Sequence, residues 1–298
     1  MNDAAPHRAG LHAQGPMSAA MPASGCTPVS ASGLPSLVDI GANLAHDSFD
    51  ADLDAVLHRA TLAGVTQIVV TGSSAESNRK ALALALGHPG RLYATAGLHP
   101  HHASEWEASL AAQIRELAAQ PQVVALGECG LDYFRNYSPQ ADQRRAFAAQ
   151  LALAAETGKP LFLHQRDAHA DFLAMLREHR PQLGPVVVHC FTDTQAALED
   201  YLALDCHIGI TGWICDERRG THLLDAVRII PDTRLMVETD APYLLPRTAP
   251  KTSHRRNEPA YLVWVVRALA AARRQSEAAV AAATSATARA FFGLPAPE

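Results

Sequence analysis

Short apolar runs alternate with longer amphipathic or alanine-rich segments along most of the chain. The apolar runs have the length and β-branched content of buried strands, and eight of them span 37–40, 67–71, 92–97, 123–127, 161–164, 186–189, 207–210 and 235–238. The segments between them predict helices at 50–63, 74–86, 105–119, 140–156, 168–179, 195–203 and 221–229, with a last helical region from 257 to about 292. This alternation is typical of repeated βα units, and we predict a (β/α)8 TIM barrel.

Glycine and proline mark the ends of these elements. Glycines follow several predicted helices and prolines precede several predicted strands, at Gly64, Gly87, Gly158, Pro121, Pro160, Pro185 and Pro231. Polar, motif-like loops begin at the opposite ends of the strands, which favours a barrel whose functional face lies at the C-terminal strand ends. A doubly wound open sheet is the main alternative, but no phosphate-binding glycine loop follows the first predicted strand.

The chain has the length and composition of one large domain with an extension. Its 298 residues, 48% of them hydrophobic, are enough for a single barrel core. Residues 1–36 are rich in Ala, Pro, Ser and Gly and lack a sustained apolar stretch. We therefore predict a disordered N-terminal extension over 1–36 and a barrel domain over 37–298.

Charge and cysteine content limit the partners and the compartment. A formal net charge of -5 argues against a chain that coats nucleic acid by overall charge, although it leaves a local cationic groove open. The five cysteines are odd in number and lack C-x-x-C spacing, which favours a reduced compartment, and we predict the cytoplasm. No apolar stretch approaches the roughly 20 residues of a membrane span. We expect no membrane partner. The sequence does not indicate whether the protein is a monomer or an oligomer.

Acidic or imidazole side chains stand at or just past the C-terminal ends of four predicted strands. They are Glu128, His164, His189 and Asp240. In a parallel barrel these ends open onto one face, so the four side chains are expected to meet there. Carboxylates and neutral imidazoles supply the lone pairs that a divalent cation needs, which indicates a metal-dependent hydrolase. The alternatives are a histidine that only bonds a loop carbonyl and an aspartate that only caps a turn.

Seven sequence words, in order, carry a family resemblance. They are GLHPH at 97–101, GECGLD at 127–132, HQRD at 164–167, HCFT at 189–192, GITGWICDERRG at 209–220, ETDAPYLLP at 238–246 and RRNEP at 255–259. Together they resemble the TatD family of metal-dependent deoxyribonucleases, within the amidohydrolase-like barrels, and the last three words resemble the TatD subgroup itself. The resemblance runs from about residue 38 to the C-terminus.

The resemblance implies roles for individual residues. Glu128, His164 and His189 match the family's metal ligands, with Glu128 able to bridge two ions. Asp240 matches its catalytic aspartate, which takes a proton from water and helps to ligate the ion. Glu238 would point the same way as Asp240 and orient a ligand or a substrate group. His99 matches the histidine at the substrate phosphate. The implied activity is 3'-to-5' exonuclease action on single-stranded DNA, or on RNA, with Mg²⁺.

The first predicted strand departs from the wider family pattern. Many relatives begin with D-x-H-x-H, whereas residues 39–43 read Asp-Ile-Gly-Ala-Asn, with Gly41 and Asn43 in place of two ligand histidines. Similar openings occur in the TatD subgroup, which makes this a subgroup trait. The remaining set of imidazoles and carboxylates suits weakly held Mg²⁺ or Mn²⁺, one or two ions, better than a closed zinc site, and Zn²⁺ stays open.

Cationic and aromatic residues in the same loops indicate a polyanionic substrate. We predict that it is bound by His101, Arg135, Arg166, Arg218 and Arg255. Tyr133, Phe134 and Trp213 could stack on unpaired bases. The alternatives are ion pairing of the arginines with Asp167, Asp216 and Glu217, and packing of the aromatic rings.

Other functions compete with this interpretation. The same barrel could hydrolyse an amide, or an ester such as misacylated tRNA. Gly41 and Asn43 raise the alternative of a non-catalytic nucleic-acid-binding protein with a degenerate centre. A closed structural metal site is a further alternative. Cys129 and Cys190 adjoin the predicted ligands, but no His/Asn partner marks either as a nucleophile, and we interpret both as packed side chains.

Overall fold

Eight parallel strands form the centre of the molecule in the computed structural model, which describes residues 33–250 and 255–296. They pair in chain order and comprise β1 (Leu37–Ala42), β2 (Val65–Val70), β3 (Leu92–Ala96), β4 (Val123–Asp132), β5 (Leu161–Arg166), β6 (Val186–Val188), β7 (His207–Ile210) and β8 (Leu235–Val237). Backbone hydrogen bonds join the two end strands, because the Asp240 N–H donates to the Gly41 carbonyl at 2.8 Å and the Asn43 N–H donates to the Ala241 carbonyl at 2.7 Å. The predicted (β/α)8 barrel is confirmed.

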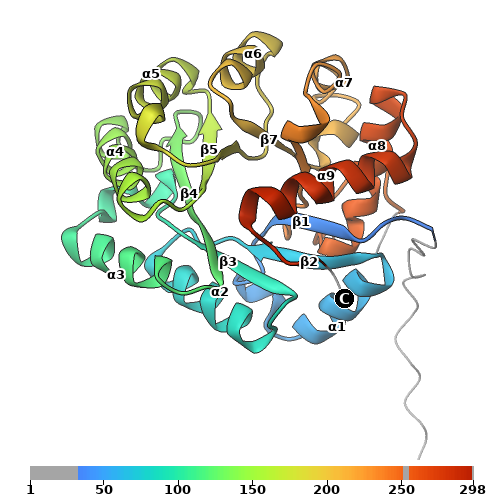
Figure 1. Ribbon diagram of the computed structural model, residues 1–298, viewed down its shortest axis with the longest axis horizontal. Helices are drawn as coiled ribbons and strands as arrows, with labels where there is room; N and C mark the ends of the chain where they lie inside the picture. The colour runs from blue at the N-terminus through green and yellow to red at the C-terminus, as the bar shows by residue number, and fades with distance from the viewer. Residues whose placement is uncertain (1–32, 251–254, 297–298) are drawn as a thin grey trace, which may run out of the picture.

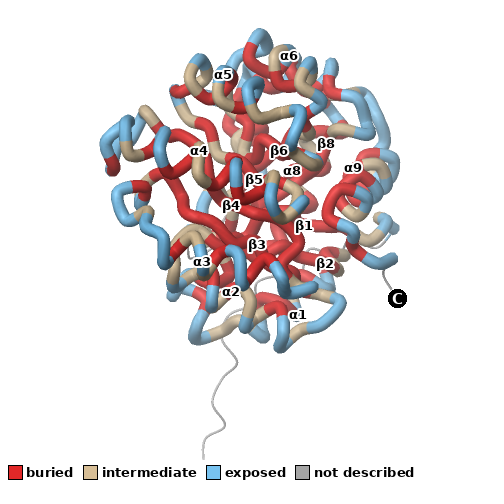
Figure 2. Tube along the Cα trace, turned by 60° about the vertical axis from the view of Figure 1, so that its left-hand side comes forward, coloured by how far each residue is buried: buried red, intermediate tan, exposed pale blue. Residues whose placement is uncertain are grey.

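Helices surround the strands (Figure 1). They are α1 (Leu53–Leu62), α2 (Ala75–Gly87), α3 (Ala108–Ala118), α4 (Gln140–Thr157), α5 (His169–His179), α6 (Gln195–Ala203), α7 (Leu223–Ala226), α8 (Leu262–Arg273) and α9 (Glu277–Phe292). Buried positions follow the strands and the inner helix faces, whereas exposed positions lie on the outside of the helical ring (Figure 2). Side chains and glycine define the ends of several helices. Ser74 and Ser77 form a capping box at the start of α2, and Gly158 ends α4 in the left-handed conformation.

Two predicted helices differ from the structure. The segment predicted as a helix over 221–229 holds only the single turn α7. The last helical region is interrupted at Arg274, whose φ of 56° is incompatible with a continuing right-handed helix, so it forms α8 and α9. Ser276 then caps the new helix by accepting from the Ala279 N–H.

Two strands extend beyond their apolar runs. The prediction placed Glu128 and His164 at strand ends, and this was wrong, because β4 continues to Asp132 and β5 continues to Arg166. The pairing shifts register between Leu126 and Cys129 and then resumes as Gly130 opposite His164. Two of the polar residues in these extensions, Glu128 and His164, line the cavity described below. His189 and Asp240 do follow the ends of β6 and β8 as predicted.

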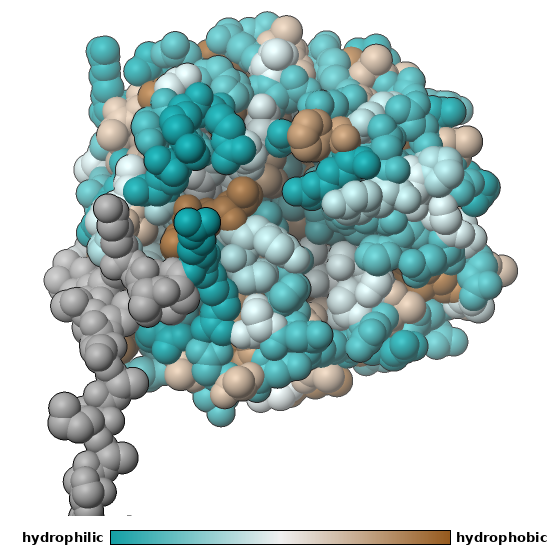
Figure 3. Space-filling view, turned by 180° about the vertical axis from the view of Figure 1, so that it is seen from behind, coloured by the Kyte–Doolittle hydropathy of each residue, from teal (hydrophilic) through white to brown (hydrophobic). Residues whose placement is uncertain are grey.

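Helix α9 closes the N-terminal end of the barrel. Its Phe291 and Phe292 cluster with apolar side chains inside the barrel, among them Val38, Val69 and Val124. Figure 1 shows α9 lying across the barrel end that faces the viewer. The C-terminal strand ends are therefore at the opposite face, which is the one seen in Figure 3.

The predicted extension over 1–36 falls almost entirely outside the described residues, so it and the domain boundary at 37 stay predictions. Among the helices that the structure does describe, none combines the length and the hydropathy that crossing a membrane requires. The cytoplasmic location also stays a prediction.

Candidate metal centre

A cavity of about 220 Å³ opens at the C-terminal ends of the strands. All four predicted ligands, Glu128, His164, His189 and Asp240, line it. They come from four different strands or from the loops that follow them. The other lining residues are Asn43, Ser73, His99, His101, His102, Arg135, Cys190 and Tyr243. The barrel thus brings together four predicted ligands that span 112 positions of the sequence, from Glu128 to Asp240.

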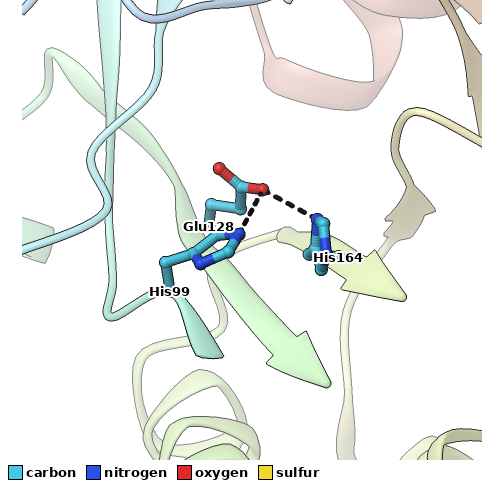
Figure 4. A group of neighbouring side chains, drawn as sticks. All are labelled: His99, Glu128 and His164. Carbon is cyan, nitrogen blue, oxygen red and sulfur yellow. Dashed lines mark ion pairs between the residues drawn. The ribbon is translucent and has the colours of Figure 1, made fainter. Parts of the chain in front are cut away.

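One carboxylate oxygen lies at the centre of this cavity wall. Oε1 of Glu128 is 2.8 Å from Nε2 of His189, 3.1 Å from Nδ1 of His164 and 3.3 Å from Nε2 of His99. Figure 4 shows the Glu128 carboxylate directed between the rings of His99 and His164. Burial raises the pKa of Glu128, but His99 and His189 outweigh it and hold this pKa well below its ordinary value. Glu128 is therefore an anion that ring nitrogens surround.

The hydrogen bonds of His189 direct one nitrogen at Glu128. Its Nδ1 lies 3.3 Å from Oε2 of Glu238, whose carboxylate is fully buried. A proton on Nδ1 satisfies this contact and leaves the lone pair of Nε2 facing Oε1 of Glu128. Two lone pairs at 2.8 Å repel each other unless a proton or a cation lies between them. Burial lowers the pKa of His189, but Glu128 and Glu238 together raise it well above its ordinary value, so a proton occupies this position when no cation does.

His164 presents a similar arrangement. Its ring lies between two carboxylates, with Nδ1 near Glu128 and Nε2 3.4 Å from Oδ2 of Asp132. Nε2 is buried and forms no hydrogen bond among the described residues. Nδ1 of His164 and Nε2 of His189 thus converge on the Glu128 carboxylate, and such a set of electron-pair donors fits a divalent cation. His99, Glu128 and His164 have ligand atoms that all lie within 4.8 Å of one another.

His99 differs from the other two histidines. Its Nδ1 accepts the His101 backbone N–H at 3.1 Å, so the proton of the neutral ring is on Nε2. Burial lowers the pKa of His99 to about 4, which outweighs the opposite effect of Glu128. His99 is thus a neutral hydrogen-bond donor that faces the cavity, and its Nε2 has no lone pair for a metal.

Asp132 is a site residue that the sequence analysis did not single out. It is 1% exposed and accepts from Nε2 of His101 at 2.9 Å and from the Arg135 N–H at 2.8 Å. The same carboxylate faces His164. It therefore positions one predicted ligand and one predicted substrate contact. Its place at the end of the GECGLD word, on the same strand as Glu128, was the available signal.

Asp240 is partly buried and held from the first strand. Nδ2 of Asn43 donates to Oδ1 of Asp240 at 3.0 Å. Burial raises the pKa of Asp240 to about 7, with Glu128 and Glu238 adding to the rise and His189 opposing it. A carboxylate with a raised pKa is a better proton acceptor than an ordinary aspartate. Asp240 therefore has the environment of a general base.

Two buried carboxylates support this arrangement. Asp39 accepts from the Thr239 N–H at 3.0 Å and from the Thr239 hydroxyl at 2.5 Å, which fixes the segment between β8 and Asp240. Glu238 accepts the Cys190 N–H at 2.5 Å in addition to its contact with His189. Burial raises the pKa of the Cys190 thiol well above its ordinary value, which fits the interpretation of Cys190 as a packed side chain.

Steric crowding explains why residue 41 is a glycine. A Cβ on Gly41 would collide with Oε2 of Glu238 and with the ring of Phe162. A histidine at this position would need the space that Glu238 occupies. The departure from D-x-H-x-H is therefore built into the packing between β1 and the residue that follows β8.

The predicted substrate-binding residues fall into different places. His101 and Arg135 line the cavity. The Arg166 guanidinium lies over the rings of Phe134 at 5.0 Å and Trp213 at 5.4 Å. Arg218 pairs with Asp216 and lines a second cavity of about 150 Å³. Arg255 is exposed and does not line the first cavity.

Some predicted alternatives are also seen. Arg218 and Arg219 both pair with buried Asp216, as the ion-pairing alternative expects. Tyr133 packs partly and donates to Oδ2 of Asp171 at 2.7 Å. Trp213 is covered by Arg219 at 4.5 Å as well as by Arg166. These two rings are therefore engaged within the protein.

Comparison with known proteins decides the family. Residues 38–293 match the family described as TatD related DNase. The chain belongs to this family. The TatD resemblance of the seven sequence words is thereby confirmed. A metal centre is consistent with membership, because Glu128 and His164 belong to a group of metal-binding residue types whose ligand atoms lie within 4.8 Å of one another.

Curated TatD relatives cover nearly all of the barrel. The chain is 50% identical over 259 residues to a Musicola paradisiaca protein named 3'-5' ssDNA/RNA exonuclease TatD. The aligned region covers 87% of this chain and 98% of that protein. It is 46% identical to the Escherichia fergusonii protein of the same name, over 87% of this chain and 99% of that protein. Among solved structures, the TatD homologue YJJV from Escherichia coli has 30% identity and a TM-score of 0.79, over 87% of this chain and 98% of that one.

Proposed function

We propose that the protein is a metal-dependent exonuclease that hydrolyses single-stranded DNA or RNA from the 3' end. The proposal is supported by relatives at 46–50% identity that carry this activity in their names. The observation that carries it is the buried Oε1 of Glu128 with three ring nitrogens within 3.3 Å. Within the same cavity lie a carboxylate with a raised pKa and an arginine, which are the groups that phosphodiester hydrolysis needs.

The proposed ligands are Glu128, His164, His189 and Asp240, and the proposed cofactor is Mg²⁺ or Mn²⁺, as one ion or two. Two carboxylates beside two imidazoles form a mixed oxygen and nitrogen set that also accepts Zn²⁺. A divalent cation held here would supply positive charge that makes water more acidic and offsets charge on the phosphoryl group.

The chain's own residues would then divide the remaining work. Asp240 accepts the proton of the attacking water, while Asn43 holds its Oδ1. Glu238 fixes the ring of His189 from behind. His99 donates from Nε2 to a phosphoryl oxygen, for which its neutral state is sufficient. His101, held by Asp132, and Arg135 contact the phosphate from the β3 and β4 side.

An end-labelled single strand tests this proposal. The 5'-labelled and 3'-labelled forms of one oligonucleotide would be incubated with Mg²⁺, Mn²⁺, Zn²⁺ or EDTA, alongside a matched blunt duplex and an aminoacyl ester. We expect stepwise shortening of the 5'-labelled strand, early release of the label from the 3'-labelled strand, and no reaction in EDTA. Cleavage of the ester alone would instead support the amide or ester hydrolase.

Substitutions connect the activity to the site. Glu128→Gln keeps the side-chain volume and removes the charge that the three imidazoles surround, so we expect at least a 100-fold loss of turnover. Glu116→Gln, on the exposed face of α3, is the matched control. Equal activity of both variants would refute this site.

A further inference from the structure

Large hydrophobic side chains that are exposed to solvent divide by type and by position. Within the described residues, the aliphatic ones are Leu62, Leu86, Leu224 and Ile229, which lie on or next to helices. The aromatic ones are Phe134, Tyr137 and Tyr243, with 61%, 71% and 52% of their surface exposed. All three aromatic residues lie in the loops that follow β4 and β8, at the face where the metal cavity opens.

Tyr243 lies on the cavity wall itself. It follows Asp240 by three residues, and its N–H donates to the Asp240 carbonyl at 2.9 Å. Burial raises the pKa of its hydroxyl, with Asp240 and Glu128 adding to the rise and Arg135 opposing it. The ring is therefore close to the predicted ligands, while half of its surface stays open to solvent.

Tyr137 lies beside the same cavity on the β4 side. Its ring packs on the cavity residue His101, with 4.7 Å between ring centroids and 60° between the planes. Phe134, three residues earlier, lies against the Arg166 guanidinium at 5.0 Å. The Arg135 side chain, between the two, lines the cavity. Aromatic rings and cationic groups thus alternate along this loop.

These rings are suited to a single-stranded polyanion. The face is mostly hydrophilic, and its hydrophobic patches are small and separate (Figure 3), so it offers no broad apolar surface to a folded protein. Nucleobases have flat apolar faces that stack on single aromatic rings, and Arg135 supplies charge for the phosphates between them. In a duplex the base faces are already stacked on one another, and the rings have nothing to bind.

We propose that Tyr137 and Tyr243, assisted by Phe134, form an aromatic rim on which unpaired bases next to the scissile phosphate stack. This rests on the proposed function, because it assumes that a nucleic acid phosphate enters the metal cavity. The rim gives the protein a requirement for an unpaired end that the metal centre alone does not provide. Of the rings predicted from the sequence to stack on bases, only Phe134 belongs to this rim, and Tyr137 and Tyr243 take the place of Tyr133 and Trp213 because their rings are exposed beside the cavity.

Binding in EDTA separates this inference from catalysis. Fluorescence anisotropy would give the Kd of the full chain for a labelled 12-nucleotide single strand, for the same strand with abasic residues at its three 3'-terminal positions, and for a blunt duplex. Stacking on one ring typically changes affinity by about 5- to 100-fold. We expect Tyr137→Ala and Tyr243→Ala each to raise the Kd for the normal strand by roughly 10-fold. The Kd for the abasic strand should change little in either variant.

Conservative and matched variants complete the test. Tyr137→Phe and Tyr243→Phe keep the ring and should bind as the wild type does. Leu86→Ala removes an equally exposed side chain, at the end of α2, and should also bind normally. The inference is overturned if the alanine variants bind the normal strand with the wild-type Kd, or lose equal affinity for normal and abasic strands. If the wild type binds single strands through the rim but cleaves none in Mg²⁺, Mn²⁺ or Zn²⁺, the rim stands and the proposed function fails.

Discussion

Nδ2 of Asn43, on the segment after β1, donates a hydrogen bond of 3.0 Å to Oδ1 of Asp240, on the segment after β8. The two residues are 197 positions apart and meet where the first and last strands close the barrel. The bond holds one oxygen of the Asp240 carboxylate and so limits how this carboxylate can turn in the cavity. An asparagine in the place of a ligand histidine therefore orients the residue that we propose as the base.

Asn43→Ala should lower kcat with little change in KM. The variant keeps Asp240 but frees its carboxylate to rotate, and misplacement of a base commonly costs about 10- to 100-fold in turnover. Steady-state kinetics on a single-stranded oligonucleotide would measure both constants. Asn43→Asp should lose more turnover than Asn43→Ala. A second carboxylate beside Asp240 raises the pKa of Asp240 further, so that more of it is protonated at neutral pH and cannot accept a proton. A kcat for Asn43→Ala within twofold of the wild type would contradict the orienting role.

Removing the central carboxylate should remove the metal. Glu128→Gln leaves the imidazoles of His164 and His189 without the anion that they share, and an amide oxygen is a weaker ligand than a carboxylate. Isothermal titration of Mn²⁺ into the EDTA-stripped protein should give at least a 10-fold weaker affinity for this variant than for the wild type. Glu116→Gln is again the control, and an unchanged Mn²⁺ affinity in Glu128→Gln would exclude these residues as the centre.

Gly41→Ala should destabilise the protein. The added methyl group collides with Oε2 of Glu238 and with Phe162, both of which are buried. Overpacking of this kind typically costs about 1–3 kcal/mol in the free energy of unfolding. Urea unfolding would measure the loss.

Gly87→Ala is the matched control for that experiment. Gly87 is the last residue of α2, and a Cβ there meets nothing within 4 Å. This variant should be neutral or slightly stabilising, because alanine favours helix and restricts the unfolded chain. Equal stability of Gly41→Ala and the wild type would show that β1 yields to a side chain, and the steric account of the missing histidine would then be wrong.

The barrel could be predicted from the sequence because each βα unit is a local pattern. Apolar runs of four to six residues that alternate regularly with helical segments favour parallel strands, and all eight predicted strands are present. The predicted strands ended where the apolar runs ended, which placed Glu128 and His164 at strand tips. Their real position inside β4 and β5 depends on pairing between polar segments, which only the neighbouring strand decides.

The sequence predicted that Glu128, His164, His189 and Asp240 lie close together, and they do line one cavity, because each belongs to the C-terminal part of a strand or the loop after it. Their supporting residues could not be predicted, because support depends on side-chain directions across the barrel. Asp132 and Asn43 each hold a site residue that follows or belongs to another strand, and no local pattern shows which residue each one contacts. From the sequence, Gly41 is a position where a ligand histidine is missing. Only the structure shows that the packing of Glu238 leaves no space for a side chain there. The arginines show the same limit, since Arg135 lines the metal cavity whereas Arg218 pairs with Asp216.

The stability of the barrel should fall in mild acid partly through His207, which begins β7 far from the metal centre. Its ring packs against Phe291 of α9, with 4.8 Å between centroids. Burial, with help from the Arg234 charge, lowers the pKa of His207 to about 4. In the unfolded chain the ring takes up its proton near pH 6.5. Between these values the unfolded state binds more protons than the folded state, so this contribution to stability is complete above pH 6.5 and is lost as the pH falls towards 4.

His207→Phe should therefore flatten the acid side of the stability profile. Phenylalanine keeps the contact with Phe291 and does not titrate. Urea unfolding in EDTA at pH 7.5 and at pH 5 would give the loss of stability for each protein, and we expect a loss about 1–2 kcal/mol smaller for the variant, after allowing for the partial exposure of the ring. Other groups titrate equally in both proteins and cancel in the comparison. Identical losses would mean that His207 is free to protonate in the folded barrel.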